Sequence, residues 1–167
     1  MVTADDLKKK LGLAAHPEGG FYVQTYKSGE RIPGESLDSR YGSARSTSTA
    51  IYYLLEPRTF SEMHRLKSDE IFHFYLGDPV EMLQLWPDGS SRRVVLGSDL
   101  ASGHSLQQVV PKDVWQGSYL LEGGRFALLG CTVAPGFEFE DYQSGTRDGL
   151  IRQYPREQDL IAKLTRK

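Results

Sequence analysis

The sequence predicts an all-β protein whose short antiparallel strands form a sandwich, barrel or jelly roll. Runs rich in aromatic and β-branched residues recur along most of the chain, and such residues favour strands. Turn sequences separate these runs at short intervals, and many short strands with frequent turns are typical of these architectures. Helical patterns occur only near the two ends.

The predicted strands follow one another with regular turn signals. They are Phe21–Tyr26, Thr49–Leu55, Glu70–Leu76, Val80–Trp86, Arg92–Leu96, Leu106–Val110, Val114–Leu121 and Arg125–Val133. Four turn sequences rich in Gly, Pro and Asp separate strands of the second half: Gly77-Asp78-Pro79, Pro87-Asp88-Gly89, Pro111-Lys112-Asp113 and Glu122-Gly123-Gly124. The Gly, Ser and Arg-rich residues 28–46 predict a long exposed loop after the first strand.

Helices are predicted at residues 3–11 and 155–166, on either side of a barrel core of about residues 18–142. Thr3 can cap the first helix, with acidic residues in its first turn, lysines in its last and Gly12 just beyond. Pro155 precedes a charged segment in which Leu160, Ile161 and Leu164 recur at helical spacing.

Composition limits the size of the protein and the kinds of partner. A chain of 167 residues with 39% hydrophobic content can bury one good core, so residues 1–167 are predicted to form a single domain. The net charge of −2 comes from scattered acidic and basic residues without a basic stripe, so no nucleic-acid partner is expected. No apolar stretch is long enough to span a bilayer and residues 1–10 lack the apolar core of a secretory signal, which predicts a cytoplasmic protein without membrane contact.

Cys131 is the sole cysteine of the sequence, so it cannot form an intramolecular disulfide. Between Gly130 and Thr132, it is predicted to be a small buried hydrophobic residue rather than a reactive thiol.

The segment from His64 to Gly77 carries the most informative pattern. His64, Glu70 and Gly77 occupy positions of the first motif of the cupin superfamily, a His-x-His pair followed by a glutamate and a glycine, and the segment resembles that motif. The later segment Pro111-Lys112-Asp113-Val114-Trp115-Gln116 resembles the second cupin motif, Pro-x-Gly-x-x-His. The resemblance implies a jelly-roll barrel in which the motif side chains bind one divalent transition metal.

Two ligand positions of these motifs hold other residues. Leu66 stands in place of the second histidine and Gln116 in place of the late one, while Asp113 replaces the glycine. Leucine offers no donor atom, and an amide oxygen is a weak donor for iron, manganese, nickel or zinc. We therefore expect no cofactor and a metal-free polar pocket, the alternative being a reduced metal site of His64, Glu70 and Gln116.

A wider resemblance runs from Glu18-Gly19-Gly20-Phe21-Tyr22 to Pro135-Gly136-Phe137-Glu138-Phe139. With Ile51-Tyr52-Tyr53-Leu54-Leu55 and the two motif segments, these phrases are similar to the branch of small single-domain proteins called cupin type 5. That resemblance implies a homodimeric jelly roll, similar to the barrel of the deoxysugar-nucleotide epimerases, that binds a small polar or sugar-like ligand.

Strand alternation indicates which side chains face the barrel interior. If Glu70 points inward, Phe72, Phe74 and Leu76 share its face and His73 points outward. If Gln116 points inward, so does Ser118, whereas Trp115 and Tyr119 face outward. The predicted ligand-binding wall combines apolar and polar side chains, as suits a small polar ligand: Phe72, Phe74, Gln116 and Ser118, beside His64 and Glu70.

Without a metal, these residues favour proton-transfer chemistry. Epimerisation beside a carbonyl needs a base to remove a carbon-bound proton and an acid to return one. His64 is the predicted base, oriented by Glu70, and Tyr53 or Tyr22 the predicted acid. A phosphate or carboxylate of the substrate could be held by an arginine, but the sequence assigns none among Arg45, Arg58 and Arg65.

Three hypotheses about function remain open. The first is a metal-independent epimerase or isomerase acting on a sugar-like or nucleotide-sugar substrate, and the second is a non-catalytic module that binds a small molecule. The third is a metallo-cupin with a reduced ligand set. Fold alone cannot separate them.

Two outer surfaces bear on assembly. The aromatic face of Trp115 and Tyr119 predicts a homodimer, because so small a barrel would otherwise expose a large apolar area. The run Glu138-Phe139-Glu140-Asp141 predicts either a strand that crosses to the partner or a solvated edge.

Overall fold

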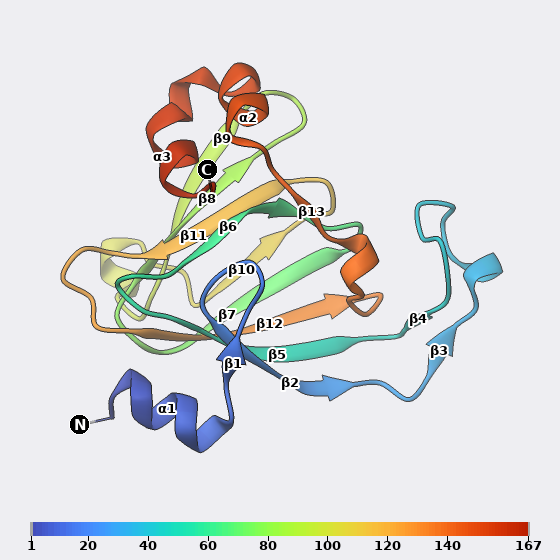
Figure 1. Cartoon of the computed structure of the whole chain (residues 1–167), viewed down its shortest axis with the longest axis horizontal. Coiled ribbons are helices and arrows are strands. Elements are labelled where there is room, and N and C mark those ends of the chain that lie inside the picture. Colours follow the sequence, from blue (N-terminus) through green and yellow to red (C-terminus); the bar gives the residue numbers. More distant parts are fainter. Residues whose placement is uncertain (1, 167) are drawn as a thin grey trace.

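The computed structural model describes residues 2–166, which form two antiparallel sheets packed face to face with helices on the outside (Figure 1). The larger sheet has the spatial order β1 (Ala14–Ala15), β2 (Phe21–Lys27), β5 (Thr49–Leu55), β12 (Ala127–Ala134), β7 (Asp69–Gly77), β10 (Gln107–Val110). The smaller sheet has the order β13 (Gln143–Ser144), β6 (Phe60–Arg65), β11 (Trp115–Leu120), β8 (Val80–Leu85), β9 (Ser91–Leu96). The predicted antiparallel jelly roll with short helices is confirmed.

Each of the predicted strands is present, with ends shifted by a few residues at most. Strand β6 was not predicted, because its sequence Phe-Ser-Glu-Met-His-Arg alternates poorly and contains no turn signal of its own. That strand carries His64, so its local geometry decides much of the site described below.

The N-terminal helix α1 (Ala4–Leu11) begins and ends where the sequence predicted. Thr3 and Asp6 form a reciprocal capping box, and Gly12 ends the helix with a left-handed backbone at φ 68°. The C-terminal segment differs from the prediction: it contains α2 (Arg147–Gln153), the 3₁₀ helix η4 (Pro155–Glu157) and α3 (Gln158–Lys163). Helix α2 escaped prediction because it is short and contains Gly149.

Residues 28–46 form an arm that projects from the barrel (Figure 1), in agreement with the predicted exposed loop. The arm contains the short strands β3 (Arg31–Ile32) and β4 (Arg45–Ser46), which pair with each other, and the 3₁₀ helix η1 (Gly34–Ser36). A further 3₁₀ helix, η2 (Leu100–Ser102), follows β9.

The main core lies between the two sheets, and both contribute to it. It includes Phe72, Phe74 and Leu129 from the larger sheet and Met82 and Leu120 from the smaller sheet. Side chains that alternate inward from both sheets therefore supply the apolar burial that favours this architecture.

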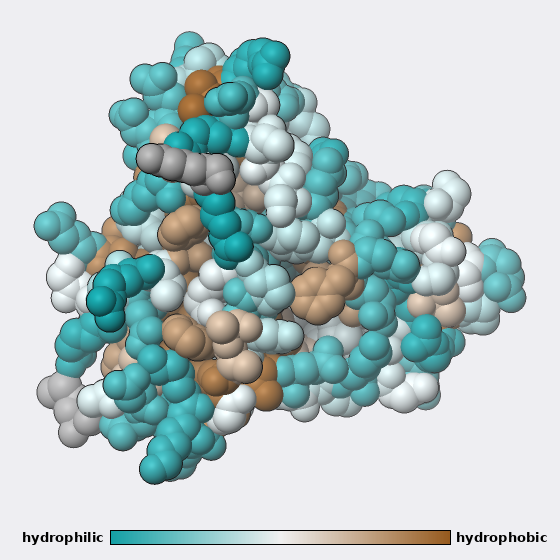
Figure 2. Space-filling model, in the orientation of Figure 1, coloured by the Kyte–Doolittle hydropathy of each residue, from teal (hydrophilic) through white to brown (hydrophobic). Residues whose placement is uncertain are grey.

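Helices cover the outer face of each sheet. Helix α1 packs through Leu7 against Leu54 and Leu128 of the larger sheet. Helices α2 and α3 pack on the smaller sheet in a cluster of Met63, Leu83, Leu85, Leu150, Tyr154, Ile161 and Leu164. In the face shown in Figure 2, hydrophobic residues gather over the middle of the molecule, whereas the C-terminal helices and the arm are mostly hydrophilic.

The face of Trp115 and Tyr119 is not an open apolar surface as the sequence suggested. Both side chains pack against the cluster under α2 and α3, so the chain itself covers them. The homodimer stays a prediction, now resting on the exposed Tyr75, Leu76 and Val109 of the larger sheet.

Strand β7 departs from the predicted alternation at its end. Leu76 was expected to share the inward face of Glu70, but the register against β12 shifts between Leu128 and Leu129. This β-bulge inserts one extra residue into β7 and turns Leu76 outward, where it is 39% exposed. His73 lies on the outer face, as expected, and contacts Thr132 and Gln107.

Among residues 2–166, no helix has the length and apolar character needed to cross a membrane.

Leu164→Ala should loosen the C-terminal helices from the barrel. Leu164 is fully buried and its carbonyl accepts a hydrogen bond from the Met63 N–H of β6 at 2.8 Å. Truncation leaves a cavity, so urea denaturation should show a free energy of unfolding lower by about 2–5 kcal/mol. Leu100→Ala, at an exposed leucine, should change it by less than about 0.5 kcal/mol. Equal effects of the two substitutions would contradict this packing.

Candidate functional site

A cavity of about 250 Å³ lies at one end of the barrel interior, beside the main core. Strands β2, β5, β6, β7 and β12 contribute to its wall, together with the turn before β2 and the segment after β12. Its lining residues are His16, Glu18, Tyr22, Gln24, Thr49, Ile51, His64, Leu66, Glu70, Cys131, Val133, Phe137 and Phe139.

A β-bulge in β6 points His64 into this cavity. The pairing of β6 with β11 places Gln116 opposite His64 and Ser118 opposite Ser61, so β6 holds one more residue than its partner between these pairs. Ser61 and His64 therefore both face the interior, while Met63 packs outward under the C-terminal helices.

The turn between β1 and β2 places an acidic side chain, Glu18, in the cavity wall. The backbone N–H of His16 donates to the carbonyl of Gly20, and the backbone N–H of Gly19 donates to the carbonyl of His16. Gly19 has φ +108°, and a Cβ there would lie 2.0 Å from the Phe60 carbonyl oxygen of β6. Glycine is thus required for the turn to approach β6 closely enough to place Glu18 beside His64.

Glu70 reaches the interior from β7 and bonds across the barrel. The Gln116 Nε2 of β11 donates to the Glu70 Oε2 at 2.5 Å, which joins the two sheets through the interior. Both side chains are buried, so the hydrogen bond satisfies an amide and a carboxyl that would otherwise be costly to bury.

The two carboxyls favour their neutral forms. Burial raises the pKa of Glu18 to about 8, although the Ser61 hydroxyl donates to it at 3.2 Å. Burial likewise raises the pKa of Glu70 to about 7, against a smaller lowering by His64. Near neutral pH the cavity thus contains a carboxylic acid able to donate a proton and a second carboxyl close to its midpoint.

The two imidazoles also favour their neutral forms. Burial lowers the pKa of His16 to about 4, and burial lowers the pKa of His64 despite the nearby Glu70. The His64 Nδ1 lies 2.7 Å from the Glu62 carbonyl oxygen, which can only accept, so Nδ1 carries the hydrogen and Nε2 has a free lone pair. This lone pair faces the Glu18 Oε2 at 3.5 Å.

Aromatic side chains form much of the remaining wall. The His16 ring meets the Tyr22 ring edge-on at 4.4 Å, and the Phe137 and Phe139 rings meet edge-on at 5.0 Å. Tyr142 stacks on His64 at 5.0 Å and donates to the Glu62 carboxylate, which limits rotation of the imidazole.

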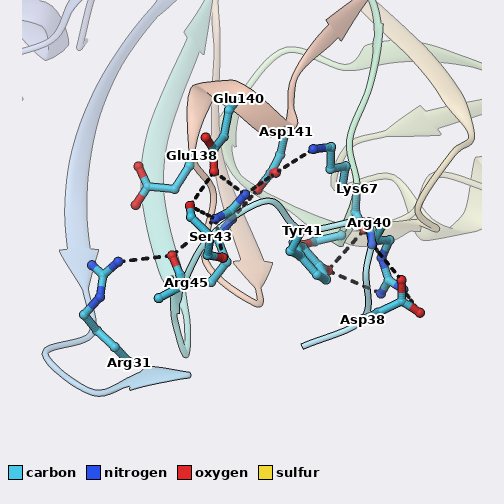
Figure 3. Close-up of polar contacts among 12 residues, drawn as sticks. Arg31, Asp38, Arg40, Tyr41, Ser43, Arg45, Lys67, Glu138, Glu140 and Asp141 are labelled. Carbon is cyan, nitrogen blue, oxygen red and sulfur yellow. Dashed lines mark hydrogen bonds and ion pairs between the residues drawn. The ribbon is translucent and has the colours of Figure 1, made fainter. Parts of the chain in front are cut away.

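The segment that carries Phe139 is fixed by a buried ion pair. Residues Phe139–Asp141 form the 3₁₀ helix η3 rather than the strand that was one prediction for this acidic run, with Phe139 and Glu140 exposed and Asp141 buried. Arg45, from β4 of the arm, donates to both oxygens of Asp141 at 2.7 and 2.6 Å, and also pairs with Glu140 (Figure 3). Arg45 is therefore engaged within the protein rather than directed to a ligand.

The structure brings together some of the predicted site residues. His64 and Glu70 line the cavity, and Gln116 lies behind Glu70 as its hydrogen-bond partner. Leu66, the replacement for the second motif histidine, is part of the wall. Cys131 also lines it, and burial raises the pKa of its thiol, in keeping with an unreactive residue.

Tyr22, the alternative predicted acid, lines the cavity, whereas the other predicted residues lie outside the lining. Tyr53 is buried in the main core, and its hydroxyl donates to the Gly19 carbonyl at 2.7 Å. Phe72 and Phe74 belong to the same core, deeper between the sheets. Ser118 is buried on β11 opposite Ser61 and Met82.

Sequence reasoning missed Glu18, His16 and the aromatic segment after β12. The phrase His16-Pro17-Glu18-Gly19-Gly20 held the signal, since an acid beside two glycines at a strand start can be aimed inward by a tight turn. Phe137 and Phe139 gave none, because contacts with residues distant in sequence bring their segment against the cavity, among them Arg45 with Asp141 and the Thr49 hydroxyl with the Phe137 N–H.

The donor set does not fit a metal of the cupin kind. Over the described residues 2–166, no group of three or more His, Cys, Asp or Glu side chains has an arrangement suited to a metal ion. The Gln116 amide presents its nitrogen to Glu70, and a nitrogen that donates cannot serve as the third ligand. Leu66 contributes only carbon to the wall.

Comparison with known proteins agrees with the geometry. The family model described as Cupin superfamily (DUF985), type 5, matches residues 5–144. The chain belongs to this cupin family. A curated relative of this cupin is the uncharacterized protein YML079W of Saccharomyces cerevisiae. The two are 31% identical over 138 residues, which cover 78% of this chain and 69% of the relative.

Solved structures extend the comparison. A hypothetical protein from Leishmania major matches 99% of this cupin with a TM-score of 0.89 and 30% identity, covering 100% of that chain. Protein SO0799 from Shewanella oneidensis matches 99% of each chain with a TM-score of 0.87 and 36% identity. Oxalate decarboxylase from Bacillus subtilis matches 90% of this cupin and 37% of its own chain with a TM-score of 0.54 and 13% identity, a likeness of fold alone.

Stability should fall as the pH rises above about 6.5, because the folded cupin holds protons that the unfolded chain releases. Glutamates in the unfolded chain titrate near 4.5, whereas in the fold the pKa of Glu70 is raised to about 7 and that of Glu18 to about 8. The stability that these two carboxyls contribute is therefore complete below pH 4.5 and is lost as the pH rises through their folded pKa values. His16 and His64 have pKa values lowered from 6.5, so below that pH they make stability rise with pH. Only in that range do they oppose the effect of the glutamates.

The expected slope is roughly 1 kcal/mol per pH unit between about pH 6.5 and 8, measured by urea denaturation across that range. In Glu18→Gln the slope should be smaller, since one titrating carboxyl is gone. A flat or rising profile for the unsubstituted protein would show that these carboxyls are ionised in the fold.

Arg45→Leu should destabilise the fold by about 3–5 kcal/mol, because it leaves the buried Asp141 without its partner. The double substitution Arg45→Leu with Asp141→Leu removes both charges and should be less destabilised than the single one. Thermal denaturation of the three proteins measures this; a double variant less stable than Arg45→Leu would argue against a coupled pair.

Proposed function

We propose that this cupin binds a small sugar-like molecule in the barrel cavity and isomerises or epimerises it by metal-independent proton transfer. The proposal rests on the presence, in one small cavity, of a neutral base and of two carboxyls with pKa values of about 7 and about 8. Acid and base groups poised near the working pH are what general acid–base catalysis requires.

His64 is the proposed base. Its Nε2 has a free lone pair because the Glu62 carbonyl fixes the hydrogen on Nδ1. Taking a proton from the carbon beside a carbonyl breaks that C–H bond, and its electron pair forms the carbon–carbon double bond of an enediol. The Glu62 carbonyl thereby takes the orienting role that the sequence suggested for Glu70.

Glu18 is the proposed acid. As the carbonyl electrons move onto oxygen, the Glu18 carboxyl can donate its proton there, 3.5 Å from the base that has just gained one. The reverse transfer, to the neighbouring carbon or to the other face of the same carbon, completes an isomerisation or an epimerisation without oxidant or reductant. Glu18 replaces Tyr53 in this role, since the Tyr53 hydroxyl hydrogen is used by the Gly19 carbonyl.

Glu70 is the second proposed proton carrier. It reaches the cavity from the opposite sheet to His64, and Gln116 holds one of its oxygens while the other remains for the ligand or Cys131. Groups on two walls of one cavity are the arrangement that proton return to the opposite face of a carbon demands.

Deuterium exchange tests this function. The protein is incubated in D₂O with a panel of free aldoses and ketoses, and proton NMR follows the hydrogen on the carbon beside the carbonyl. We expect enzyme-dependent exchange with at least one sugar, undiminished by EDTA, and a fall in rate above about pH 8, where Glu18 loses its proton. His64→Asn and Glu18→Gln should each lower the rate by about 100-fold or more.

His73→Gln provides the matched control, because His73 is a histidine on the outer face of β7 and should leave the rate unchanged. Binding of a sugar without exchange would overturn the enzymatic proposal in favour of a binding module. Exchange abolished by EDTA would instead favour the metallo-cupin.

A further inference from the structure

The cavity wall contains two carboxyls and two imidazoles whose pKa values are lowered, but no lysine or arginine. Lysine and arginine are absent from its lining, whereas Glu18 and Glu70 are both at least nine-tenths buried there. A phosphate or carboxylate on a ligand needs cationic or backbone N–H partners once water is removed. This wall offers acids in their place.

The cations near the cavity rim are already paired. Arg45 binds Asp141 and Glu140, Lys67 lies 3.6 Å from Asp141, and Lys27 binds Glu138 at 2.6 Å. On the other side of the rim, Arg166 lies 3.0 Å from the Glu62 carboxylate. Recruiting Arg45 to a ligand would leave the buried Asp141 without the cation that binds both of its oxygens.

Helix termini do not supply the missing positive potential either. Helix α1 packs on the outer face of the larger sheet, and α2 and α3 pack on the outer face of the smaller one. Among the described residues, the 3₁₀ helix η3 is the helical element that reaches the cavity, and it is a single short turn with two acidic residues.

The dimensions and the remaining wall fit a single polar ring. A volume of about 250 Å³ lies below the range of about 300–1,000 Å³ typical of sites for drug-sized ligands. Tyr22, Phe137 and Phe139 offer apolar faces, while Gln24 and Thr49 add neutral hydrogen-bonding groups beside the acids. Hydroxyl groups can both donate to and accept from such a set, and the C–H face of a sugar ring can lie on an aromatic ring.

We propose that the ligand is a neutral, unphosphorylated sugar of one ring, and that the cavity rejects the phosphorylated and nucleotide-linked forms of that sugar. This rests on the proposed function, whose substrate class it narrows to the free sugar. The raised pKa values of Glu18 and Glu70 agree with it, since a neutral ligand leaves both acids able to donate hydrogen bonds. An anionic group would face them without a counter-ion.

Binding measurements with matched probes test this inference. The unsubstituted protein is titrated calorimetrically with glucose, galactose, mannose, xylose, rhamnose, fucose and fructose, then with the available monophosphates and nucleoside diphosphate conjugates of the same sugars. We expect at least one free sugar to bind, and its phosphate and nucleotide conjugate to bind at least tenfold more weakly. A conjugate that binds as tightly as its free sugar overturns the inference, and so does a panel in which no free sugar binds.

Phe139→Ala places the binding in this cavity. Phe139 lines the wall but is 53% exposed, so its truncation should leave the fold intact while weakening the free sugar about fivefold. Leu100→Ala, exposed and remote from the wall, should leave affinity unchanged. Unchanged affinity in Phe139→Ala would overturn the assignment. Tight binding of a free sugar without deuterium exchange would sink the catalytic proposal and leave this inference standing.

Discussion

The register between β6 and β11 is the constraint on which the site depends. One extra residue in β6 lets Ser61 and His64 face the interior while Met63 anchors the C-terminal helices outside. Without the bulge, strict alternation would put Ser61 and Met63 on one face and His64 on the other. The same pairing places Gln116 opposite His64, from where its amide reaches Glu70 on the facing sheet.

Burial then determines the chemical character of these groups. Carboxyls removed from water without a cationic partner retain their protons, and imidazoles in the same surroundings lose theirs. Near neutral pH the cavity therefore combines proton donors and acceptors, with Glu70 close to its midpoint and the other three groups mainly neutral. In a metal-binding cupin the cation would instead stabilise the ionised form of the carboxylate. Here Leu66 and Gln116 occupy two of the positions whose side chains would bind that cation.

Most of the fold could be predicted because local patterns and tertiary packing agree. Turn sequences and β-branched runs located the strands, and the paired signals at Thr3 and Gly12 located α1. The site was only partly predictable. His64 and Glu70 stand in a recognisable motif, but Glu18 comes from a turn that depends on an approach to β6 distant in sequence. Tyr53, Phe72 and Phe74 lie in the core. Strand alternation predicted that such side chains point inward, but it does not indicate how deep between the sheets they lie.

The clamp between Arg45 and Asp141 has a consequence for recognition. This ion pair (Figure 3) fixes the segment bearing Phe139 before any ligand arrives. Tyr142 does the same for the His64 ring. Ordering of these groups has thus been completed during folding, so little conformational entropy remains to be lost when a small molecule enters. A ligand with few atoms has little interaction free energy to offset such a loss, and a preformed wall is what allows so small a cavity to discriminate at all.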